Sequence, residues 1–587
     1  MKTCKVARRA AQVLLVVLAA VFPFEAPLCR VGPLELTTVE VVLYVTLAAW
    51  GITVALEALN DRERAWGARL RDVFRAHGAA QASVGWALVL FGSALAAPSF
   101  RGAALKFALR SLSGILLFFA VRTLARPPEV ARRVVAALLG GAVVSAATGV
   151  LDWFVPATGP LWSPFRNAAF HTLGLTRASG VFAYPTIGAM YWEAAIALVV
   201  AAPALAAVAR VGRSPSIRVA TAIGASVLLI GAILASATRS GLVGAAVACV
   251  AMMALGGRTF GRTLVASSVG VLAVVVGWSA LVMAAPSSSL LGQRMRFWHD
   301  DNWLRAEYGV DASPHTARAR EEFSMTIRVH NVGSLAWEHD GPQPTLLGYH
   351  WERSVGPSSL EDYEGARSEL SADVPPGDWA EVTANLKAPG SAGTYTLHWD
   401  LLQEGVTWFS DLGNPTGDQV FAITRASETQ YSTGPRHPRV TPAPPAPSRK
   451  ALWRAAIVLW RMRPILGVGP DNFRRRYEAV LPRSPNGQPY TDQRIHANNL
   501  YFETLADLGL VGFAVLGWIA WSLGRLIAGH ASSGRLLGLA TGVSAAAFFV
   551  HGVLDYFFEF TPLFGLFWLL FGLTSSARAP APRDTPP

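Results

Sequence analysis

The chain has too few charged residues for a soluble globular protein of its length. Only 15% of its 587 residues are Asp, Glu, Lys or Arg, whereas soluble chains carry about 25%. Long apolar runs alternate with short arginine-rich breaks, and one polar block lies between about 286 and 450. This distribution excludes a single soluble domain, a disordered chain and a fibrous repeat. It indicates a multi-span membrane protein with one large soluble insertion.

Cysteine is scarce as well, because the chain has only Cys4, Cys29 and Cys249. Cys4 precedes the first apolar run and Cys249 lies inside another, so neither is well placed for a disulfide. No spacing typical of metal ligands is present either. The sequence also lacks a G-x-S-x-G elbow, a P-loop, H-E-x-x-H, C-x-x-C and a D-x-D pair. A catalytic site would therefore have to be built from residues at the outer membrane face.

The net charge of +12 does not indicate nucleic-acid binding. Most arginines stand at the ends of apolar segments, where basic residues orient a membrane protein. The first residues could be taken for a signal peptide, since Lys2, Lys5, Arg8 and Arg9 precede an apolar stretch. No clear small-residue cleavage site comes before Pro23, so we interpret this stretch as the first transmembrane helix.

About twelve segments are apolar over the roughly 20 residues that a membrane helix needs. These segments are 10–28, 35–57, 80–97, 103–124, 130–151, 184–208, 217–237, 240–256, 263–285, 507–526, 535–555 and 560–575. With the N-terminus inside, the cytoplasmic loops carry most arginines, and the short outer loops hold only Arg30, Arg101, Arg166 and Arg177. The positive-inside rule therefore predicts an α-helical polytopic membrane protein with both termini in the cytoplasm and 286–506 outside.

The polar block changes to the period-two alternation of β-strands. In 394–401, Tyr395, Leu397, Trp399 and Leu401 point one way and the polar residues the other. About seven short strands separated by turn signals predict an inserted, all-β, immunoglobulin-like sandwich. Its tryptophans either form a sugar-stacking platform or fill the core, as aromatic residues usually do in small sandwiches. The residues concerned are Trp337, Trp351, Trp379, Trp399 and Trp408.

These patterns divide the chain into membrane parts and an outer insertion. The predicted units are a membrane bundle at 1–285, a connector at 286–319, the β-sandwich at 320–425, a proline-rich linker at 426–450, an outer helical segment at 451–506, membrane helices at 507–575 and a disordered tail at 576–587. The linker should be extended and solvated.

Two arginine-containing stretches are predicted to lie at the outer membrane face. Arg177 begins the sequence RASGVFAYP at the end of an outer loop, and Arg239 lies in the short turn ATRSG between two spans. A guanidinium group offers a planar fork that suits phosphate oxygens. Each arginine therefore either binds an anion or has an ordinary role. The ordinary role is that of a loop residue at 177 and of a side chain reaching the lipid headgroups at 239.

Two more stretches precede and enter the tenth predicted span. PILGVGPDNF at 464–473 has two glycines that suit a tight turn, and RIHANNLYFETLADLGLVG occupies 494–512. A histidine at an outer membrane face has a pKa near working pH. As a general base it is worth about 10²–10⁴ in rate. His496 is therefore a candidate base, and the alternative is that it caps the following helix.

Together, RASGVFAYP, ATRSGLVG, PILGVGPDNF and HANNLYFETLADLGLVG resemble the O-antigen ligase and polymerase superfamily of bacterial envelopes. The closing HGVLD at 551–555 fits as well, and the resemblance covers about 80–285 and 450–575. It implies a glycosyltransferase of the inner membrane that uses neither a metal nor another cofactor. Its partners would be a glycan on undecaprenyl pyrophosphate as donor and, at the periplasmic face, an acceptor hydroxyl on lipid A–core, a repeat unit or another envelope molecule.

The resemblance also assigns roles to residues. It implies that Arg177 and Arg239 hold the donor pyrophosphate, where fixed guanidinium groups stabilise the charge of the leaving group. Arg494, beside the candidate base, is a third candidate ligand of the pyrophosphate. Catalysis is assigned to His496 and Arg239.

One position departs from the family pattern, which is usually His-Asn, nine residues and then Gly-x-x-Gly. Counting back from Gly509 and Gly512 puts Asn498 and Asn499 at that pair. Asn cannot act as a base near neutral pH. We therefore expect these four residues to support the motif and His496 to take the catalytic role.

Two other interpretations of the sequence remain open. A transporter of the same lipid is one, although no internal repeat is evident and most charged residues lie near span ends. A non-catalytic assembly protein of the same pathway is the other, and the asparagine at 498 keeps it open. The inserted sandwich either recruits the acceptor or the growing glycan, or is purely structural.

Overall fold

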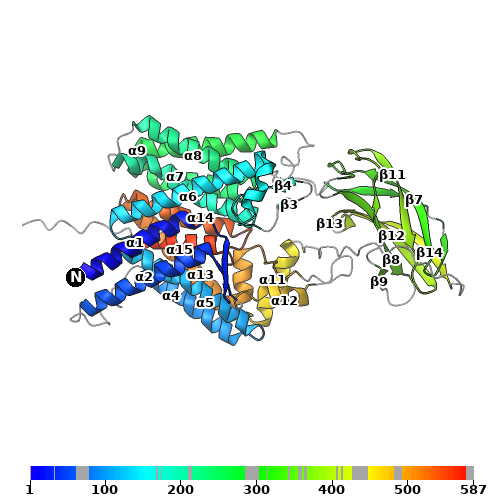
Figure 1. Ribbon diagram of the computed structural model, residues 1–587, viewed down its shortest axis with the longest axis horizontal. Coiled ribbons are helices and arrows are strands. Elements are labelled where there is room, and N and C mark those ends of the chain that lie inside the picture. Colours follow the sequence, from blue (N-terminus) through cyan, green and yellow to red (C-terminus); the bar gives the residue numbers. More distant parts are fainter. Residues whose placement is uncertain are drawn as a thin grey trace, which may run out of the picture.

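The chain forms a bundle of membrane-type helices and a separate β-sandwich (Figure 1). The computed structural model describes residues 2–31, 34–60, 78–166, 170–172, 175–208, 214–284, 303–311, 313, 315–340, 344–354, 360–362, 366–404, 407–410, 414–425, 447, 449–481 and 492–576. Most of the predicted proline-rich linker and nearly all of the predicted C-terminal tail lie outside these residues.

The first half of the bundle is built from long helices. They are α1 (Lys2–Val21), α2 (Thr38–Asn60), α4 (Ala79–Ala96), α5 (Arg101–Leu124), α6 (Pro128–Phe154), α7 (Pro185–Val208), α8 (Pro215–Ala235) and α9 (Arg239–Met283). Helices α6, α7 and α8 each begin with proline, whose fixed φ suits the first helical position. Helix α9 is two helices across a kink at Gly261, where φ is 75°.

Short hairpins and a 3₁₀ helix connect some of these helices. Strands β1 (Pro27–Val31) and β2 (Leu34–Thr37) pair between α1 and α2. Helix η1 (Pro156–Trp162) and the pair β3 (Phe170–Thr172) and β4 (Leu175–Arg177) stand between α6 and α7.

The second half of the bundle follows the sandwich in sequence. It consists of α11 (Arg449–Met462), α12 (Phe473–Arg476), η3 (Tyr477–Ala479), α13 (Leu500–Ser532), α14 (Leu536–His551) and α15 (Thr561–Ser576). Helix α15 packs on α5 at Gly114, where a Cβ would lie 2.4 Å from Cδ1 of Trp568. A small residue at this position lets the two helices approach closely.

The polytopic helical fold with a β insertion is confirmed. Among the described residues, nine helices are long and apolar enough to cross a membrane. They are α2, α4, α5, α6, α7, α8, the two halves of α9, and α13, while α14 and α15 are shorter apolar helices. Helix α1 overlaps the predicted first span, 10–28, only as far as Val21 and is not among the nine. Helix α13 begins at Leu500, before the predicted 507.

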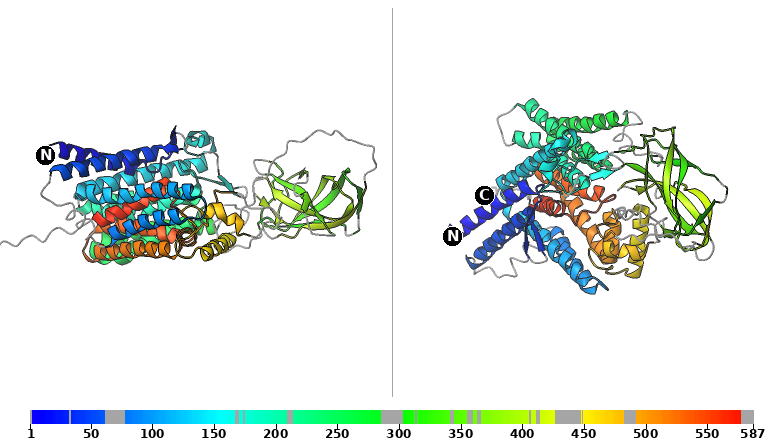
Figure 2. Two further views of the ribbon diagram at one scale, coloured as in Figure 1. Left: turned by 90° about the horizontal axis from the view of Figure 1, so that it is seen from below. Right: turned by 45° about the vertical axis from the view of Figure 1, so that its right-hand side comes forward.

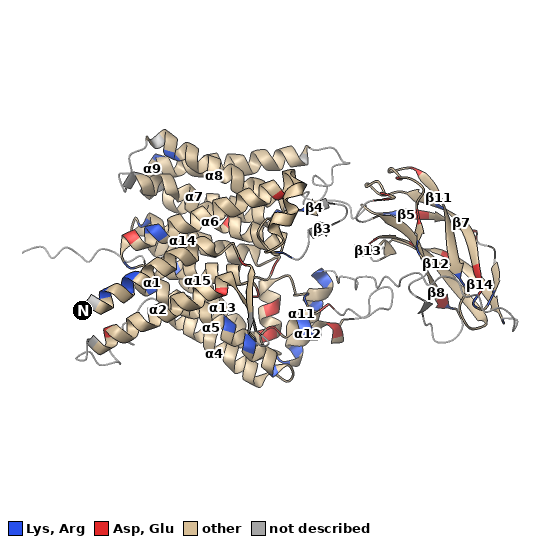
Figure 3. Cartoon of the chain, in the orientation of Figure 1, with Lys and Arg blue, Asp and Glu red and all other residues tan. Residues whose placement is uncertain are grey.

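Charged residues lie mainly toward the two ends of the bundle, and its middle is largely uncharged (Figure 3). Helix α1 begins at the end away from the sandwich, whereas α11, α12, β3 and β4 lie at the end that faces it (Figures 1 and 2). The predicted outer stretches therefore gather at one end of the bundle.

The sandwich contains a larger and a smaller sheet. Its strands are β5 (Ala306–Gly309), β6 (His315–Arg318), β7 (Glu322–Asn331), β8 (Thr345–Arg353), β9 (Leu360–Asp362), β10 (Ser368–Glu369), β11 (Trp379–Lys387), β12 (Gly393–Gln403), β13 (Thr407–Trp408) and β14 (Gly417–Thr424). The larger sheet has the order β10-β8-β12-β14-β6, with β13 on β12 and β9 on β8, and the smaller has the order β11-β7-β5. Strands β5 and β6 lie in the predicted connector, because runs of four residues are too short for period-two alternation to reveal.

Most of the named tryptophans fill the core of the sandwich. Trp337, Trp351 and Trp399 are fully buried and Trp408 is nearly so, whereas Trp379 is 47% exposed. In β12 the predicted inward residues are buried together with Trp399. Four of the five tryptophans are therefore buried, as the core interpretation expects. Trp379 is the one of the five that stays at the surface.

Candidate functional site

The loop between α14 and α15, at 552–560, joins the first and fourth sequence stretches. The backbone N–H of Leu500 donates to the carbonyl of Gly552 at 2.7 Å. The ring of Tyr556 stacks on His496 with centroids 5.0 Å apart. At the far end of the loop, the ring of Phe560 contacts that of Tyr184, 6.0 Å away. The loop therefore contacts the first and fourth stretches directly. The third stretch packs on the fourth, and the second is hydrogen-bonded to His551 at the end of α14.

The glycine motifs form a break in α13 that the third stretch fills. Gly509 has φ 64°, so the helix is interrupted there. The freed carbonyls of Ala506 and Asp507 accept from the N–H groups of Val468 and Gly469, each at 3.0 Å. A Cβ at Gly509 would lie 2.4 Å from the backbone of Ile465. The two stretches thus need glycine for close backbone contact and form one unit.

Asp507 organises the turn that follows PILGVG. Its two carboxylate oxygens accept from the backbone N–H groups of Asp471 and Phe473, each at 2.7 Å. Asp471 in turn receives both ends of the Arg474 guanidinium, each at 2.7 Å. Burial tends to lower the pKa of Arg474, but the hydrogen bond and the charge of Asp471 have the larger effect, so this pKa is raised. This chain of contacts fixes Arg474 beside the loop between α14 and α15.

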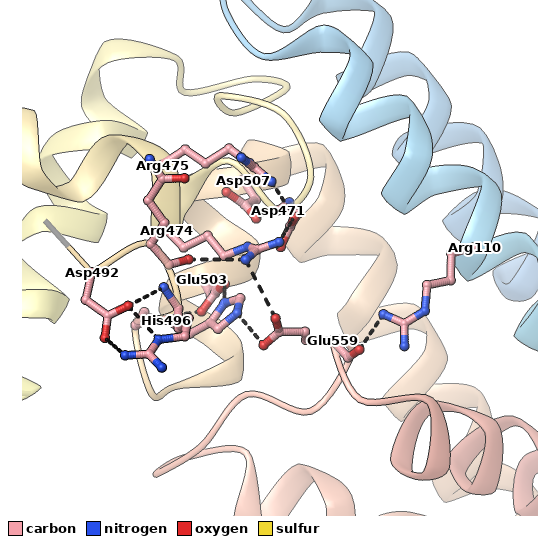
Figure 4. A network of polar contacts seen from close by, with 12 residues as sticks. Arg110, Asp471, Arg474, Arg475, Asp492, His496, Glu503, Asp507 and Glu559 are labelled. Atoms are coloured by element: carbon pink, nitrogen blue, oxygen red, sulfur yellow. Dashed lines mark hydrogen bonds and ion pairs between the residues drawn. The ribbon is translucent and has the colours of Figure 1, made fainter. Parts of the chain in front are cut away.

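His496 is buried between two carboxylates (Figure 4). Its Nδ1 is hydrogen-bonded to Glu503, and its Nε2 lies 2.6 Å from Oε2 of Glu559 in an ion pair. Burial alone would favour the neutral ring, but the charges and hydrogen bonds of the two carboxylates prevail and raise the His496 pKa well above its usual range. The imidazole is therefore held as an imidazolium near neutral pH.

Glu559 is the junction of this network. Its carboxylate pairs with His496 and lies 3.8 Å from Nη1 of Arg474, and its backbone carbonyl accepts from Arg110 of α5 at 2.5 Å. Burial tends to raise the Glu559 pKa, but His496, Arg474 and Arg110 together lower it. The Glu559 side chain is 25% exposed, against 6% for His496 and 0% for Glu503.

Behind this network lies a small pocket between α4, α5 and α13. Glu503, Thr504 and Asp507 line it on one side, and Trp86 and Tyr556 contribute aromatic walls. Burial raises the Tyr556 pKa well above its usual range, so the phenol stays protonated.

The Asn498–Asn499 pair has two different local roles. Asn498 is half-buried and has φ 48°, a left-handed conformation that asparagine tolerates better than most residues. Asn499 caps α13, because its Oδ1 accepts from the N–H groups of Tyr501 and Phe502, each at 2.9 Å. Its Nδ2 also donates to the carbonyl of Val553 at 2.6 Å. The cap of α13 is thus Asn499, and not His496 as one interpretation of the sequence had it.

Arg177 supports the turn that carries Arg239. Its Nε donates to the carbonyl of Ser236 at 2.9 Å, and its Nη2 donates to Thr238 at 3.1 Å. Ala237 in this turn has φ 49°, a strained value for alanine. Arg239 follows as the half-buried first residue of α9. Arg177 is itself buried, so it supports the Arg239 turn from the protein interior.

A second polar cluster fixes the start of α9 from inside the bundle. Ser240 is hydrogen-bonded to Nε2 of His551 at 3.1 Å, and Nδ1 of His551 lies 2.9 Å from Glu193 of α7. Asp555 lies 3.1 Å from Nε2 of His551, the nitrogen that also contacts Ser240. His551 thereby links the start of α9 to the loop that contains Glu559.

Arg494 lies at the surface, with a side chain 78% exposed. Its guanidinium forms two bonds of 2.9 Å with Asp492, which raise the Arg494 pKa and lower that of Asp492. Tyr184 is close enough to affect the Arg494 charge. Arg494 is therefore near the first stretch, although its fork is occupied by Asp492.

Within the described residues, one group of side chains could hold a metal ion. His339, Asp340 and Asp373 lie together on the sandwich, largely at its surface. His339 is hydrogen-bonded to Asp373 at 2.7 Å. This group belongs to the insertion and contributes nothing to the network around His496.

Sequence reasoning missed Glu503, Glu559, Asp471 and Arg474. Glu503 and Asp471 stood inside the quoted stretches, where acidic residues beside a candidate base were a usable signal. Nothing in the local sequence indicated Glu559, because its partners come from α5, α12 and the segment before α13.

Two family models match the chain. Residues 405–517 match the model described as O-antigen ligase, and 313–412 match an Ig-like domain described as from next to the BRCA1 gene. No curated protein matches the chain at a significant level. The first match contains PILGVGPDNF and HANNLYFETLADLGLVG, while RASGVFAYP and ATRSGLVG lie outside it. The resemblance to the O-antigen ligase superfamily, with an inserted immunoglobulin-like domain, is confirmed by these matches, and it supports glycan transfer in O-antigen biosynthesis.

Proposed function

We propose that this relative of the O-antigen ligases transfers or polymerises a glycan carried on undecaprenyl pyrophosphate. The acceptor is a hydroxyl of lipid A–core, a repeat unit or another envelope molecule, at the periplasmic face of the bacterial inner membrane. Both termini are cytoplasmic and the sandwich is periplasmic. The observation that carries the proposal is that the four stretches gather around the end of α14 and the loop that follows it, directly or through one another.

Arg239 is proposed to bind the donor pyrophosphate. It stands at the N-terminus of α9, where the helix dipole also favours an anion. Arg449, the first residue of α11, lies close enough for its charge to repel that of Arg239. Two guanidinium groups that repel each other are both stabilised by one shared anion. Arg494 extends the site toward Tyr184, and Arg177 holds the turn from which Arg239 projects.

The acceptor is proposed to react beside the His496–Glu559 ion pair. This pair is buried on the His496 side and partly open on the Glu559 side. A fixed network of charges in a partly dry site can stabilise charge that develops during transfer. We therefore keep His496 in the proposed catalytic site, as one member of this ion pair.

The sandwich is proposed to recruit the acceptor or the growing glycan through Trp379. His330 stacks on this exposed ring at 4.4 Å with an interplanar angle of 3°, and Arg328 lies over it at 4.9 Å. An exposed, pre-oriented indole is a surface on which the apolar face of a sugar can stack.

Envelope glycan profiling tests the function. A deletion strain of the host is rescued with the wild type, Arg239→Ala, His496→Ala or Arg133→Ala, and membrane expression is matched. Arg133 is an exposed arginine of α6 at the opposite end of the bundle and serves as the control. The wild type and Arg133→Ala should restore long glycan. Arg239→Ala should reduce it at least about 10²-fold, and His496→Ala at least about tenfold.

Other outcomes separate the alternatives. If all four proteins restore the glycan equally, the chain is an assembly protein and the proposal fails. If purified wild type moves the lipid-linked glycan across a bilayer but transfers none of it, the transporter interpretation replaces the proposal.

A further inference from the structure

Glu559 is the carboxylate next to His496 that an incoming hydroxyl can reach. Its side chain is 25% exposed, whereas His496 keeps 6% and Glu503 keeps none. Its position is fixed from two sides, because Arg110 binds its backbone carbonyl and Arg474 lies 3.8 Å from its carboxylate. A partly exposed carboxylate held in place by buried partners has the geometry of a catalytic acid or base.

The protonation states of the pair separate the roles of its members. His496 has a carboxylate at each ring nitrogen, Glu503 at Nδ1 and Glu559 at Nε2, so the ring carries both protons. An imidazolium has no lone pair with which to accept another proton. Glu559 is ionised, because the charges of His496, Arg474 and Arg110 lower its pKa. A carboxylate keeps lone pairs on both oxygens.

We propose that Glu559 accepts the proton of the attacking hydroxyl and that His496, Glu503 and Arg474 position it. This inference rests on the proposed function and goes beyond it by naming the group that receives the proton. The acceptor oxygen forms a bond to the anomeric carbon of the donor sugar, and the bond from that carbon to the pyrophosphate oxygen breaks. The bonding pair leaves with undecaprenyl pyrophosphate, and the hydroxyl proton moves to Glu559 and then to water.

A weakly basic carboxylate is adequate for this step. Glycosyl transfer passes through a transition state with positive charge on the sugar, and the hydroxyl becomes acidic as its bond to carbon forms. Carboxylates activate water in the same way in inverting glycoside hydrolases. The His496 charge beside Glu559 keeps the carboxylate ionised between turnovers.

The pH dependence of transfer distinguishes Glu559 from His496. The groups that face Glu559 are His496 from the segment before α13, Arg474 of α12, Arg110 of α5 and, on its own loop, Tyr556. With Glu559 as the proton acceptor, the rate rises with pH through a pKa below the usual range of glutamate and is level by about pH 6. With neutral His496 as the base, the rate would still be rising above about pH 6.5, because the pKa of His496 is raised.

The experiment uses the full chain in proteoliposomes with a lipid-linked glycan donor and a soluble acceptor. Wild-type transfer is measured first, and its absence would refute the proposed function, not the assignment of Glu559. Glu559→Gln should then lower kcat by about 10²–10⁴-fold with KM for the donor changed less than about twofold. Glu559→Asp should recover part of the rate. Glu478→Gln, on an exposed glutamate of η3, is the matched control and should behave as wild type.

Chemical rescue guards against a variant that merely folds poorly. Added formate should raise the rate of Glu559→Ala severalfold and leave that of the wild type unchanged, because a free carboxylate then takes the proton. His496→Gln should lower the rate about tenfold yet keep the level profile above about pH 6. The assignment is overturned if Glu559→Gln keeps more than half of the wild-type kcat. It is also overturned if formate has no effect, or if the wild-type rate rises above about pH 6.5 and His496→Gln removes that rise.

Discussion

The end of the bundle that faces the sandwich and the β-sandwich itself differ in where most of their charged residues lie. The bundle end buries charges in contact with one another, such as Arg166 with Asp152 at 2.6 Å and His551 with Glu193 at 2.9 Å. The sandwich leaves most of its ion pairs in solvent, such as Arg328 with Glu381, and among its ion pairs in the described residues His350 with Asp400 is the buried case.

The difference indicates where function lies. Removing a charge from water costs several kcal/mol, and the partner rarely returns more than that. Buried pairs are therefore weak contributors to stability, and clusters of them inside a membrane protein commonly mark functional sites. The sandwich bears less of this cost, because its core is mainly apolar and aromatic, and apolar burial contributes about 25 cal/mol per Å². We therefore place the proposed catalysis at this end of the bundle, and the proposed recruitment at the exposed ring of Trp379 on the sandwich.

The largest effect is expected at the buried Asp152–Arg166 pair. Asp152 also accepts from the backbone N–H groups of Ser179 and Gly180, each at 3.1 Å, so it fixes the RASG segment. Asp152→Asn leaves the Arg166 charge buried without its partner and should destabilise the bundle by about 3–5 kcal/mol. Thermal unfolding in detergent measures this, with Glu129→Gln in the exposed pair with Arg132 as control. Equal unfolding of both variants would contradict the contrast between buried and exposed pairs.

The next effect tests the break in α13. Gly509→Ala forces a left-handed alanine and brings its Cβ to 2.4 Å from the backbone of Ile465. Strain of this kind costs about 1–3 kcal/mol, and the displaced loop should lower transfer as well. Gly517→Ala in the same helix is the control, because a Cβ there meets nothing within 4 Å and alanine favours helix. A Gly509→Ala protein with wild-type stability and rate would show that the break has no role.

A smaller effect is expected from the exposed ring of the sandwich. Trp379→Ala should leave the fold intact and raise KM for the acceptor severalfold with kcat unchanged, since one stacked sugar is worth about 1 kcal/mol. Trp399→Ala, on a fully buried ring, should instead destabilise the sandwich by about 3–5 kcal/mol. Acceptor titration and unfolding measure the two. An unchanged KM in a folded Trp379→Ala protein would leave the sandwich a structural role only.

The smallest effect belongs to the solvent-exposed pair on the smaller sheet. Glu381→Gln removes the partner of Arg328, 3.8 Å away, and both side chains are mostly exposed. Such pairs contribute about 0–1 kcal/mol, so unfolding should shift by less than about 0.5 kcal/mol. A loss above about 2 kcal/mol would mean that the sandwich depends on its charges as the bundle end does.

The sequence by itself determined the membrane helices, the inserted sandwich and the four stretches. Each is a local pattern. A span needs only a run of apolar residues, and strands such as β12 need only alternation. Gly509 and Asn499 were also recognisable as motif positions, but the helix break at Gly509 and the cap at Asn499 were not predicted.

Only the tertiary structure decided which groups meet and in which protonation state. Arg110 and Glu559 stand 449 residues apart, and Ser93 and Asp507 414 residues apart, yet each pair is hydrogen-bonded. The raised pKa of His496 comes from two carboxylates, one of them on the loop between α14 and α15. Arg177 likewise gained its partners from a turn about 60 residues away. Electrostatic energy depends on distance and burial in space, and neither is encoded by the residues that flank a charge in the chain.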